Sequence, residues 1–230
     1  RVHEAGGLNE SQGLFFRDRK PLEELYDTEN DPHELTNLAD DPKHEKVLQG
    51  LRAELDAWLD DAADLGFVPE TELEKWVPSN KPRLMIADRP EYAAPPNAKG
   101  GVFGKPLSAW VDELNDSASL KRMRAAATLA LAGEEAVPVL LRALDDPDVC
   151  VAHWAAAGLG NAGVPDSGVT DALTNALGRE SKTVRLAAAG ALCALDGQDT
   201  AIPVVLALMD DPDLYVRLAA SILQRSPFSV

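Results

Sequence analysis

Apolar residues recur at helical spacing through the second half of the chain, residues 107–230. This region contains three similar copies of one pattern, which reads as a helix, a tight turn and a second helix. Asp148, Ser181 and Asp213 occupy the same place in the three copies, at steps of 33 and 32 residues. Because side chains of these types accept hydrogen bonds from the free N–H groups of a helix, each marks the start of a second helix. The pattern predicts an array of stacked helix pairs.

Small residues follow each of these caps, where two helices must approach closely. They are Ala155, Ala156, Ala187, Ala188, Ala219 and Ala220. A further pair of helices, around Trp110 and residues 122–131, precedes the three copies, so we expect about four pairs. A period near 33 residues is also typical of ankyrin and tetratricopeptide arrays, but neither signature motif is present. The turn 210–213 and the Val-Arg-Leu-Ala-Ala run at 216–220 resemble short bacterial HEAT repeats, which implies an α-solenoid.

The pattern in residues 1–75 is mixed. Short apolar pieces at 12–16 and 24–27 predict two strands, and Asn30-Asp31-Pro32 predicts a turn. A long helix follows, with Asp41 as its expected N-cap and Gly66 as its stop. Its apolar stripe consists of Val47, Leu51, Leu55, Trp58 and Ala62. We therefore expect a small α+β subdomain before the repeats, and so a mainly α protein.

Residues 76–106 separate these two parts and contain six prolines and three glycines. Such a composition forbids a long helix or a central strand. The segment is nevertheless too apolar for a free linker, because it contains Leu84, Met85, Ile86, Tyr92, Val102 and Phe103. We expect an extended strap that lies over its neighbours, and we expect residues 107–230 to unfold partly independently of residues 1–75.

The charge of the chain excludes two classes of partner. Lys and Arg number 22 against 38 Asp and Glu, which gives a net charge of −16 and a pI near 4.6. Nucleic acids and anionic membrane surfaces both require a basic face, so we expect neither as a partner. No stretch approaches the roughly 18 apolar residues that span a membrane. The 45% hydrophobic content is typical of a globular protein.

Few side chains in the sequence suggest chemistry. The acidic turns at 145–148 and 210–213 lack the alternating ligands and the glycine of a calcium loop, so we interpret them as helix caps. The run Asp27–Asp31 begins like a calcium loop, but Pro32 stands where that loop needs glycine. The remaining candidates are isolated side chains, namely His33, His44, His153, Cys150 and Cys193.

We interpret the two cysteines as buried thiols and the three histidines as structural or solvent-facing. Arg185 and Arg217 recur one repeat apart, which suggests a ladder of ion pairs to neighbouring acidic turns. There is no Ser/His/Asp or Cys/His arrangement and no glycine-rich phosphate loop. We therefore expect no catalytic, cofactor-binding or metal-binding residue in this chain.

Residues 23–39 resemble the C-terminal signature of sulfatases of the alkaline-phosphatase superfamily. The resemblance rests on the run Glu23–Glu34 followed by Asn37-Leu38-Ala39. Residues 8–16 resemble the lead-in of bacterial enzymes similar to heparan N-sulfatase, and Trp58 with residues 64–70 continues the likeness. Residues 152–160 resemble the helical repeats that some of these sulfatases carry after their catalytic fold.

The resemblance implies a catalytic centre that this sequence lacks. Sulfatases use a formylglycine made in a Cys/Ser-x-Pro/Ala-x-Arg motif, beside a divalent metal held by aspartates and an asparagine. Cys150, Cys193 and Ser221 each miss part of that motif. In the family these groups lie far upstream, so the chain resembles a C-terminal remainder. Leu25 and Tyr26 would then pack in a short antiparallel sheet, while Asp31-Pro32 and Asn37 would shape the turn.

Three functions follow as hypotheses. The first is a non-catalytic C-terminal part of a sulfatase acting on sulfated glycans, with the catalytic domain as its partner. Calcium and formylglycine are then expected in that domain, and the family implies a periplasmic or secreted protein. The second is a stand-alone HEAT-repeat module that binds a protein partner, which an uncovered solenoid face would favour. The third, an enzyme in its own right, lacks a nucleophile.

Overall fold

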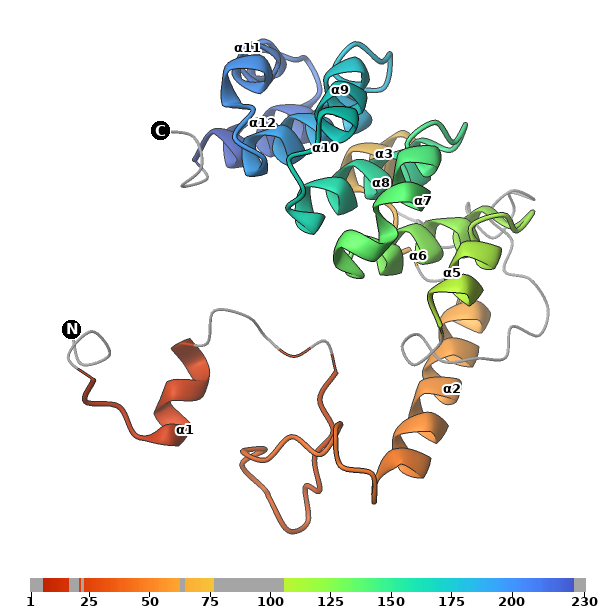
Figure 1. Ribbon diagram of the computed structural model, residues 1–230, viewed down its shortest axis with the longest axis vertical. Coiled ribbons are helices and arrows are strands. Elements are labelled where there is room, and N and C mark those ends of the chain that lie inside the picture. The colour runs from red at the N-terminus through yellow and green to blue at the C-terminus, as the bar shows by residue number, and fades with distance from the viewer. Residues whose placement is uncertain (1–5, 17–20, 22, 63–64, 77–105, 226–230) are drawn as a thin grey trace. The chain divides into compact units, whose positions relative to one another are not determined.

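The computed structural model describes residues 6–16, 21, 23–62, 65–76 and 106–225. All regular secondary structure in these residues is helical (Figure 1). The chain divides into two compact units, Arg1–Leu55 and Asp56–Val230, which are described separately. The strap expected at 76–106 lies almost wholly outside the described residues. The boundaries expected at residues 75 and 106 remain predictions.

The first unit contains short helices and turns. Helix α1 (Glu10–Gly13) runs into the 3₁₀ turn η1 (Leu14–Phe16), and α2 (Glu45–Ala62) begins in this unit and continues into the second. Asn9 forms a capping box with Gln12: the Asn9 side chain accepts from the Gln12 N–H at 2.9 Å, and the Gln12 side chain accepts from the Asn9 N–H at 3.1 Å. This reciprocal cap starts a helix where the sequence predicted a strand. The strand predicted at 12–16 is wrong.

The second predicted strand, at 24–27, is also wrong. The Leu25 N–H donates to the side chain of Asn37 at 2.9 Å, and the Leu25 carbonyl accepts from the Leu38 N–H at 2.8 Å. Because a side chain takes the N–H that a strand would offer to a ladder, the segment stays irregular. The described residues contain no strand, so the expected α+β subdomain is corrected to an all-helical one with turns.

The long helix α2 was predicted, but its start was not. Asp41 accepts from the N–H of Lys43 at 3.0 Å and so closes a turn before the helix rather than capping it. The helix itself begins four residues later, at Glu45. Competition between local turn and helix bonds accounts for the difference.

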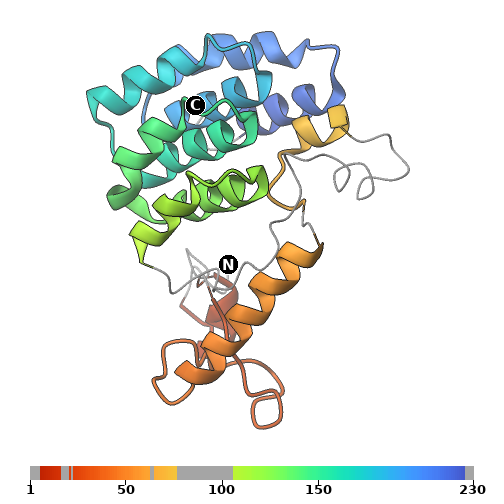
Figure 2. The ribbon, with the colours of Figure 1, turned by 90° about the vertical axis from the view of Figure 1, so that its right-hand side faces the viewer.

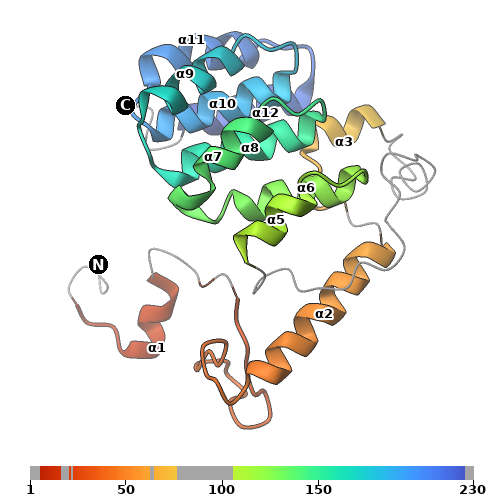
Figure 3. The ribbon, with the colours of Figure 1, turned by 45° about the vertical axis from the view of Figure 1, so that its right-hand side comes forward.

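After the end of α2, the second unit contains α3 (Glu70–Trp76) and then four helix pairs, as the sequence predicted for the pairs. The pairs are α5 (Leu107–Glu113) with α6 (Ser119–Leu129), α7 (Val137–Ala143) with α8 (Val149–Ala162), α9 (Ser167–Ala176) with α10 (Lys182–Ala194), and α11 (Gln198–Met209) with α12 (Leu214–Arg225). A 3₁₀ turn, η3 (Gly133–Ala136), precedes α7. The helices stack in two layers, with α7, α9 and α11 in one and α6, α8, α10 and α12 in the other (Figure 3).

Small residues let the second helices of the pairs pack closely. Ala155, Ala156, Ala188 and Ala220 are fully buried, as predicted. Gly160 sits so close to α10 that a Cβ there would lie 2.7 Å from the Cα of Ala191. Leucine, valine and Met123 fill the remaining core between the layers. The repeat region is therefore an α-solenoid of stacked helix pairs.

Helix α3 packs on the layer of second helices (Figures 2 and 3). Residues 65–69 lead into it, and Val68 is buried in the core of the solenoid. The indole N–H of Trp154 on α8 donates to the carbonyl of Phe67 at 2.7 Å. The first turn of α3 thus lies across the start of the repeat helices.

Candidate functional site

The acidic turns of the solenoid share one local geometry. Asp116, Asp146 and Asp211 each accept from the N–H two residues later, at 2.8, 2.8 and 3.0 Å. Asp148 and Asp213 then accept from the first helical N–H groups, both at 2.9 Å. Backbone hydrogen bonding, above all from Ala118, lowers the pKa of Asp116. Asp148 and Asp213 therefore cap their helices, as predicted, whereas Asp116, Asp146 and Asp211 close the turn just before a helix.

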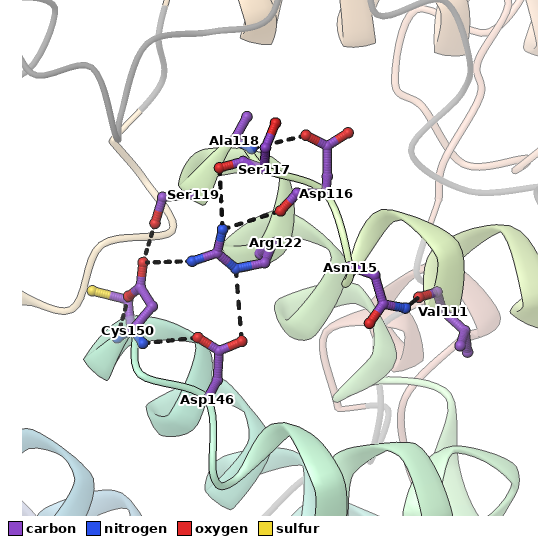
Figure 4. Close-up of polar contacts among 10 residues, drawn as sticks. Val111, Asn115, Asp116, Ser117, Ala118, Ser119, Arg122, Asp146 and Cys150 are labelled. Atoms are coloured by element: carbon purple, nitrogen blue, oxygen red, sulfur yellow. Dashed lines mark hydrogen bonds and ion pairs between the residues drawn. The ribbon is translucent and has the colours of Figure 1, made fainter.

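Ion pairs join successive turns into a ladder. The guanidinium of Arg122 donates to the carbonyls of Asp116 and Ser117 in its own turn, at 3.1 and 3.3 Å (Figure 4). It also pairs with Asp146 and Asp148 of the next turn, at 3.6 and 3.7 Å. The hydroxyl of Ser119 donates to the same Asp148 carboxylate. One side chain therefore fixes two consecutive repeats.

The predicted ladder is present, but the predicted arginines do not build it. Lys182 pairs with Asp211 at 2.8 Å, which lowers the pKa of that aspartate, and Arg179 pairs with Asp145. Arg217 donates instead to two carbonyls of its own turn, at 2.6 and 2.9 Å. Arg185 makes none of the ion pairs found among the described residues.

We call the face formed by α8, α10 and α12 the second-helix face. Among the residues that the structure describes, α3 covers one half of it and the other half is open. A cavity of about 320 Å³ flanks α3 and is bounded by residues such as Thr71, His153 and Tyr215. A groove of about 410 Å³, the open groove, lies over the later turns of the same helices. Its walls are almost entirely apolar, with Ala157, Ala191 and Ile222 among them.

A buried polar network holds α3 on this face. The hydroxyl of Thr183 on α10 donates to the carboxylate of Glu72 and lies 2.7 Å from the hydroxyl of Thr71. All three residues are buried. The ring of His153 packs edge-on against Trp154, and its Nδ1 lies 3.5 Å from the carbonyl oxygen of Thr183. Burial lowers the pKa of His153, so the ring is neutral at pH 7 and has a structural place.

The cysteines lack the surroundings of a nucleophile. Cys150 is buried in α8 and Cys193 is half-buried in α10, and neither forms a disulfide. Burial raises the pKa of the Cys193 thiol, which favours its protonated form over the nucleophilic thiolate. Within the described segments no group of three or more His, Cys, Asp or Glu side chains is placed to hold a metal ion.

Two residues of the sulfatase-like signature form hydrogen bonds with the backbone around them. The side chain of Asn37 accepts from the N–H of Leu25 and donates to the carbonyl of Glu23 at 3.0 Å. Asp31 accepts from the N–H groups of Leu35 and Thr36, both at 2.8 Å. These bonds give Asn37 and Asp31 the turn-shaping part that the resemblance implies. The sheet expected for Leu25 and Tyr26 is absent from the described residues.

The sequence predicted the apolar stripe of α2 but not how far it is exposed. The exposed fractions of Val47, Leu51, Leu55 and Trp58 are 54, 54, 48 and 59%. The neighbouring face carries the contacts instead, through the ion pair of Arg52 with Glu23, which raises the pKa of Arg52. Amphipathic spacing identifies an apolar face but does not say whether the same chain covers it.

Comparison with known proteins supports the repeats most directly. A family model described as HEAT repeats matches residues 151–223. No helix in the described part of the chain has the length and apolar character needed to cross a membrane. The second unit is thus a solenoid of helix pairs, of which residues 151–223 are similar to HEAT repeats.

A second match concerns a particular enzyme. The chain is 48% identical over 82 residues to the ulvan-active sulfatase of Formosa agariphila, which is 35% of this chain and 14% of that protein. Among solved structures, human deoxyhypusine hydroxylase in complex with glycerol aligns over 81% of this chain and 69% of its own, with a TM-score of 0.40 and 22% identity. That structural likeness is too distant to carry an argument. The sulfatase match concerns only a small part of a much longer protein.

Proposed function

We propose that this chain is a non-catalytic C-terminal part of a sulfatase, in which the HEAT-type repeats brace the catalytic domain or bind a partner. The 48% identity to the ulvan-active sulfatase over 82 residues is the observation that carries the proposal. The resemblance of residues 23–39 to the sulfatase signature agrees with it. A sulfated glycan is then the substrate class of the whole enzyme, and calcium and formylglycine belong to its catalytic domain.

The sequence positions most similar to the sulfatase motif support a structural role for this chain. Cys150 and Cys193 lie on repeat helices with apolar neighbours and form part of the solenoid packing. The acidic side chains at the turns are occupied by backbone N–H groups and by Arg122 or Lys182. A periplasmic or secreted location follows from the same family resemblance.

The chain alone should show no sulfatase activity. The expected result on incubation with an aryl sulfate and calcium is turnover equal to a blank, because no described group is placed as a nucleophile. The ulvan-active sulfatase, assayed beside it, is the positive control. Turnover that survives repurification and scales with chain concentration would contradict the proposal.

The complete reading frame that encodes this chain gives the most direct test. A Cys/Ser-x-Pro/Ala-x-Arg motif upstream, within a few hundred residues, is expected. A reading frame without that motif favours the second candidate, a HEAT-repeat module that binds a protein. The open groove of about 410 Å³ on the second-helix face is the observation behind that alternative.

A further inference from the structure

Helix α12, the last helix of the described array, exposes a line of apolar side chains. We call this line the α12 ridge and define it by Leu214, Leu218 and Ile222, whose exposed fractions are 61, 50 and 62%. Their spacing of four residues keeps them on one side of the helix over about 12 Å. The ridge lies wholly within the second unit. Apolar residues exposed together in this way are typical of an interface.

The preceding repeat shows how the same position is used inside the array. Leu218 comes 32 residues after Leu186 and occupies the same place in the repeat. Leu186 is buried on α10, against which α12 packs, whereas half of Leu218 is in solvent. The outer side of α12 therefore has the composition of an inner repeat rather than the polar outer face of a terminal one.

The open groove lies directly beside this ridge. Ile222 belongs to both, because it also forms part of the groove wall. Much of the remaining wall consists of small residues on α8 and α10, namely Ala157, Ala187, Ala191 and Ala194. One molecule thus carries an apolar projection and an apolar hollow side by side.

A ridge beside a groove suits an interface with twofold symmetry. Rotation about an axis between the two features places the ridge of each copy in the groove of the other, so one surface serves both partners. A second copy of this chain is therefore a partner that brings both matching features. Its α12 would pack as a ridge of side chains into the groove between helices.

The charged groups of the chain lie away from this contact. The net charge is −16, but none of the described residues that form the ridge or line the groove is Asp, Glu, Lys or Arg. The acidic turns at 145–148 and 210–213 precede α8 and α12, whereas the groove lies over the later turns of these helices. Repulsion between two copies is therefore long-range, and physiological salt screens it beyond about 8 Å.

We propose that a second copy of this chain occupies the open groove, so that two second-helix faces form a symmetric dimer with each α12 ridge in the partner's groove. The inference does not depend on the proposed function. Sedimentation equilibrium of the whole 230-residue chain tests it, and should show a monomer–dimer equilibrium at concentrations up to about 100 μM.

Leu218→Glu and Leu206→Glu form a matched pair of variants. Leu206 has a similar exposed fraction, 47%, but lies on α11 in the other layer and does not line the groove. Leu218→Glu should raise the dimer dissociation constant at least tenfold, because dimerisation would bury an unpaired carboxylate. Leu206→Glu should leave it unchanged. Both variants should keep the circular dichroism spectrum of the parent chain, since both positions are exposed.

A variant in the groove tests the other side of the same contact. Ala194→Glu changes an exposed residue of the groove wall on α10 and should also raise the dissociation constant at least tenfold. Raising the salt concentration should strengthen the parent dimer or leave it unchanged, because the contact is apolar and the two copies repel each other.

Four results would overturn the proposal. A monomer at every concentration would leave the ridge to another part of the same polypeptide. A dimer that Leu218→Glu and Leu206→Glu weaken equally, or that neither weakens, would form through another surface. A dimer insensitive to Ala194→Glu would exclude the groove from the contact. A dimer that dissociates as salt is raised would be held by ion pairs rather than by the ridge.

Discussion

Two glycines set how closely the repeat helices approach each other. A Cβ at Gly158 would lie 2.7 Å from the Cα of Ala130 on the preceding pair, and one at Gly160 would lie 2.7 Å from the Cα of Ala191 on the following pair. Both obstacles are backbone atoms, which cannot swing aside as a long side chain can. The middle of α8 can therefore pack this close to both neighbouring pairs only because positions 158 and 160 carry no Cβ.

Gly160→Ala should destabilise the second unit by about 1–3 kcal/mol, because overpacking against backbone outweighs the better helix propensity of alanine. The measurement is urea unfolding followed by circular dichroism. Gly50→Ala on α2 is the control, since no atom lies within 4 Å of a Cβ there, and that variant should be neutral or slightly stabilising. Equal effects at the two positions would refute the close-contact explanation.

His153 should make the stability of the second unit depend on pH near neutrality. Burial lowers its pKa below the ordinary value of 6.5, against the opposing attraction of Glu72 and the Thr183 carbonyl. The unfolded chain therefore binds a proton first as the pH falls, and stability is lost below about pH 6.5. The aspartates of the turns, whose pKa values are lowered from 3.8, lose their contribution only at more acidic pH.

The free energy of unfolding at pH 7.5 and 5.5 tests this, with His153→Gln as the comparison. The parent chain should lose more stability across that interval than the variant does. Parallel losses in the two proteins would mean that His153 does not carry the pH dependence.

Residue roles that depend on local bonds could be predicted from the sequence, and those that depend on distant ones could not. Asp148 caps α8 through an N–H two positions away, so its residue type and its position in the sequence were sufficient to predict the cap. Arg122 was missed as the ladder residue because its partners Asp146 and Asp148 lie in another repeat. Arg185 and Arg217 share a register, yet Lys182 rather than Arg185 pairs with the next acidic turn.

At the scale of elements, the ladder couples the first two helix pairs. Arg122→Ala removes two hydrogen bonds to carbonyls and two ion pairs, so it should destabilise the solenoid by about 1–3 kcal/mol. Arg142→Ala is the matched control, because Arg142 is exposed and bonds only the Pro138 carbonyl of its own helix among the contacts described. The control should change stability by less than about 0.5 kcal/mol.

Thermal and urea unfolding of both variants provide the measurement. Hydrogen exchange adds a spatial readout, since Arg122→Ala should raise exchange first in α6 and the start of α8. Loss of stability of the same size in Arg142→Ala would assign the effect to any lost arginine rather than to the ladder.

Helices and strands could be predicted where the sequence pattern repeats. They could not be predicted where a side chain competes for the backbone hydrogen bonds that the expected element would use. The four helix pairs could be predicted because the sequence repeats one pattern three times and has a further pair of helices upstream of it. The strands expected at 12–16 and 24–27 failed, because the Asn9 cap and the Asn37 side chain bind the backbone groups that strands would use. The apolar stripe of α2 was found as a pattern, but such a pattern does not say how far the stripe is exposed.

At the scale of the whole molecule, α3 was not foreseen. Thr71 and Thr183 are 112 residues apart, and nothing in the spacing of either segment indicates that they meet. The packing of α3 is also what leaves one half of the second-helix face covered and the other half open. The candidate binding groove therefore depends on tertiary contacts, whereas the solenoid that forms it depends on the repeat.

The charge of the whole chain leads to the last prediction, that this region does not hold the sulfates of a glycan. The net charge is −16, and the repeat cations that reach the turns are already paired: Arg122 with Asp146 and Asp148, Arg179 with Asp145, and Lys182 with Asp211. A polyanion would have to displace these aspartates and meet Coulomb repulsion, which salt screens only beyond about 8 Å at physiological ionic strength. Calorimetry with heparin at that salt concentration should detect no binding to the isolated chain, with a basic heparin-binding protein as the positive control. Micromolar binding that disappears as salt is raised would contradict this argument, and loss of that binding in Arg179→Glu would place it at the turns.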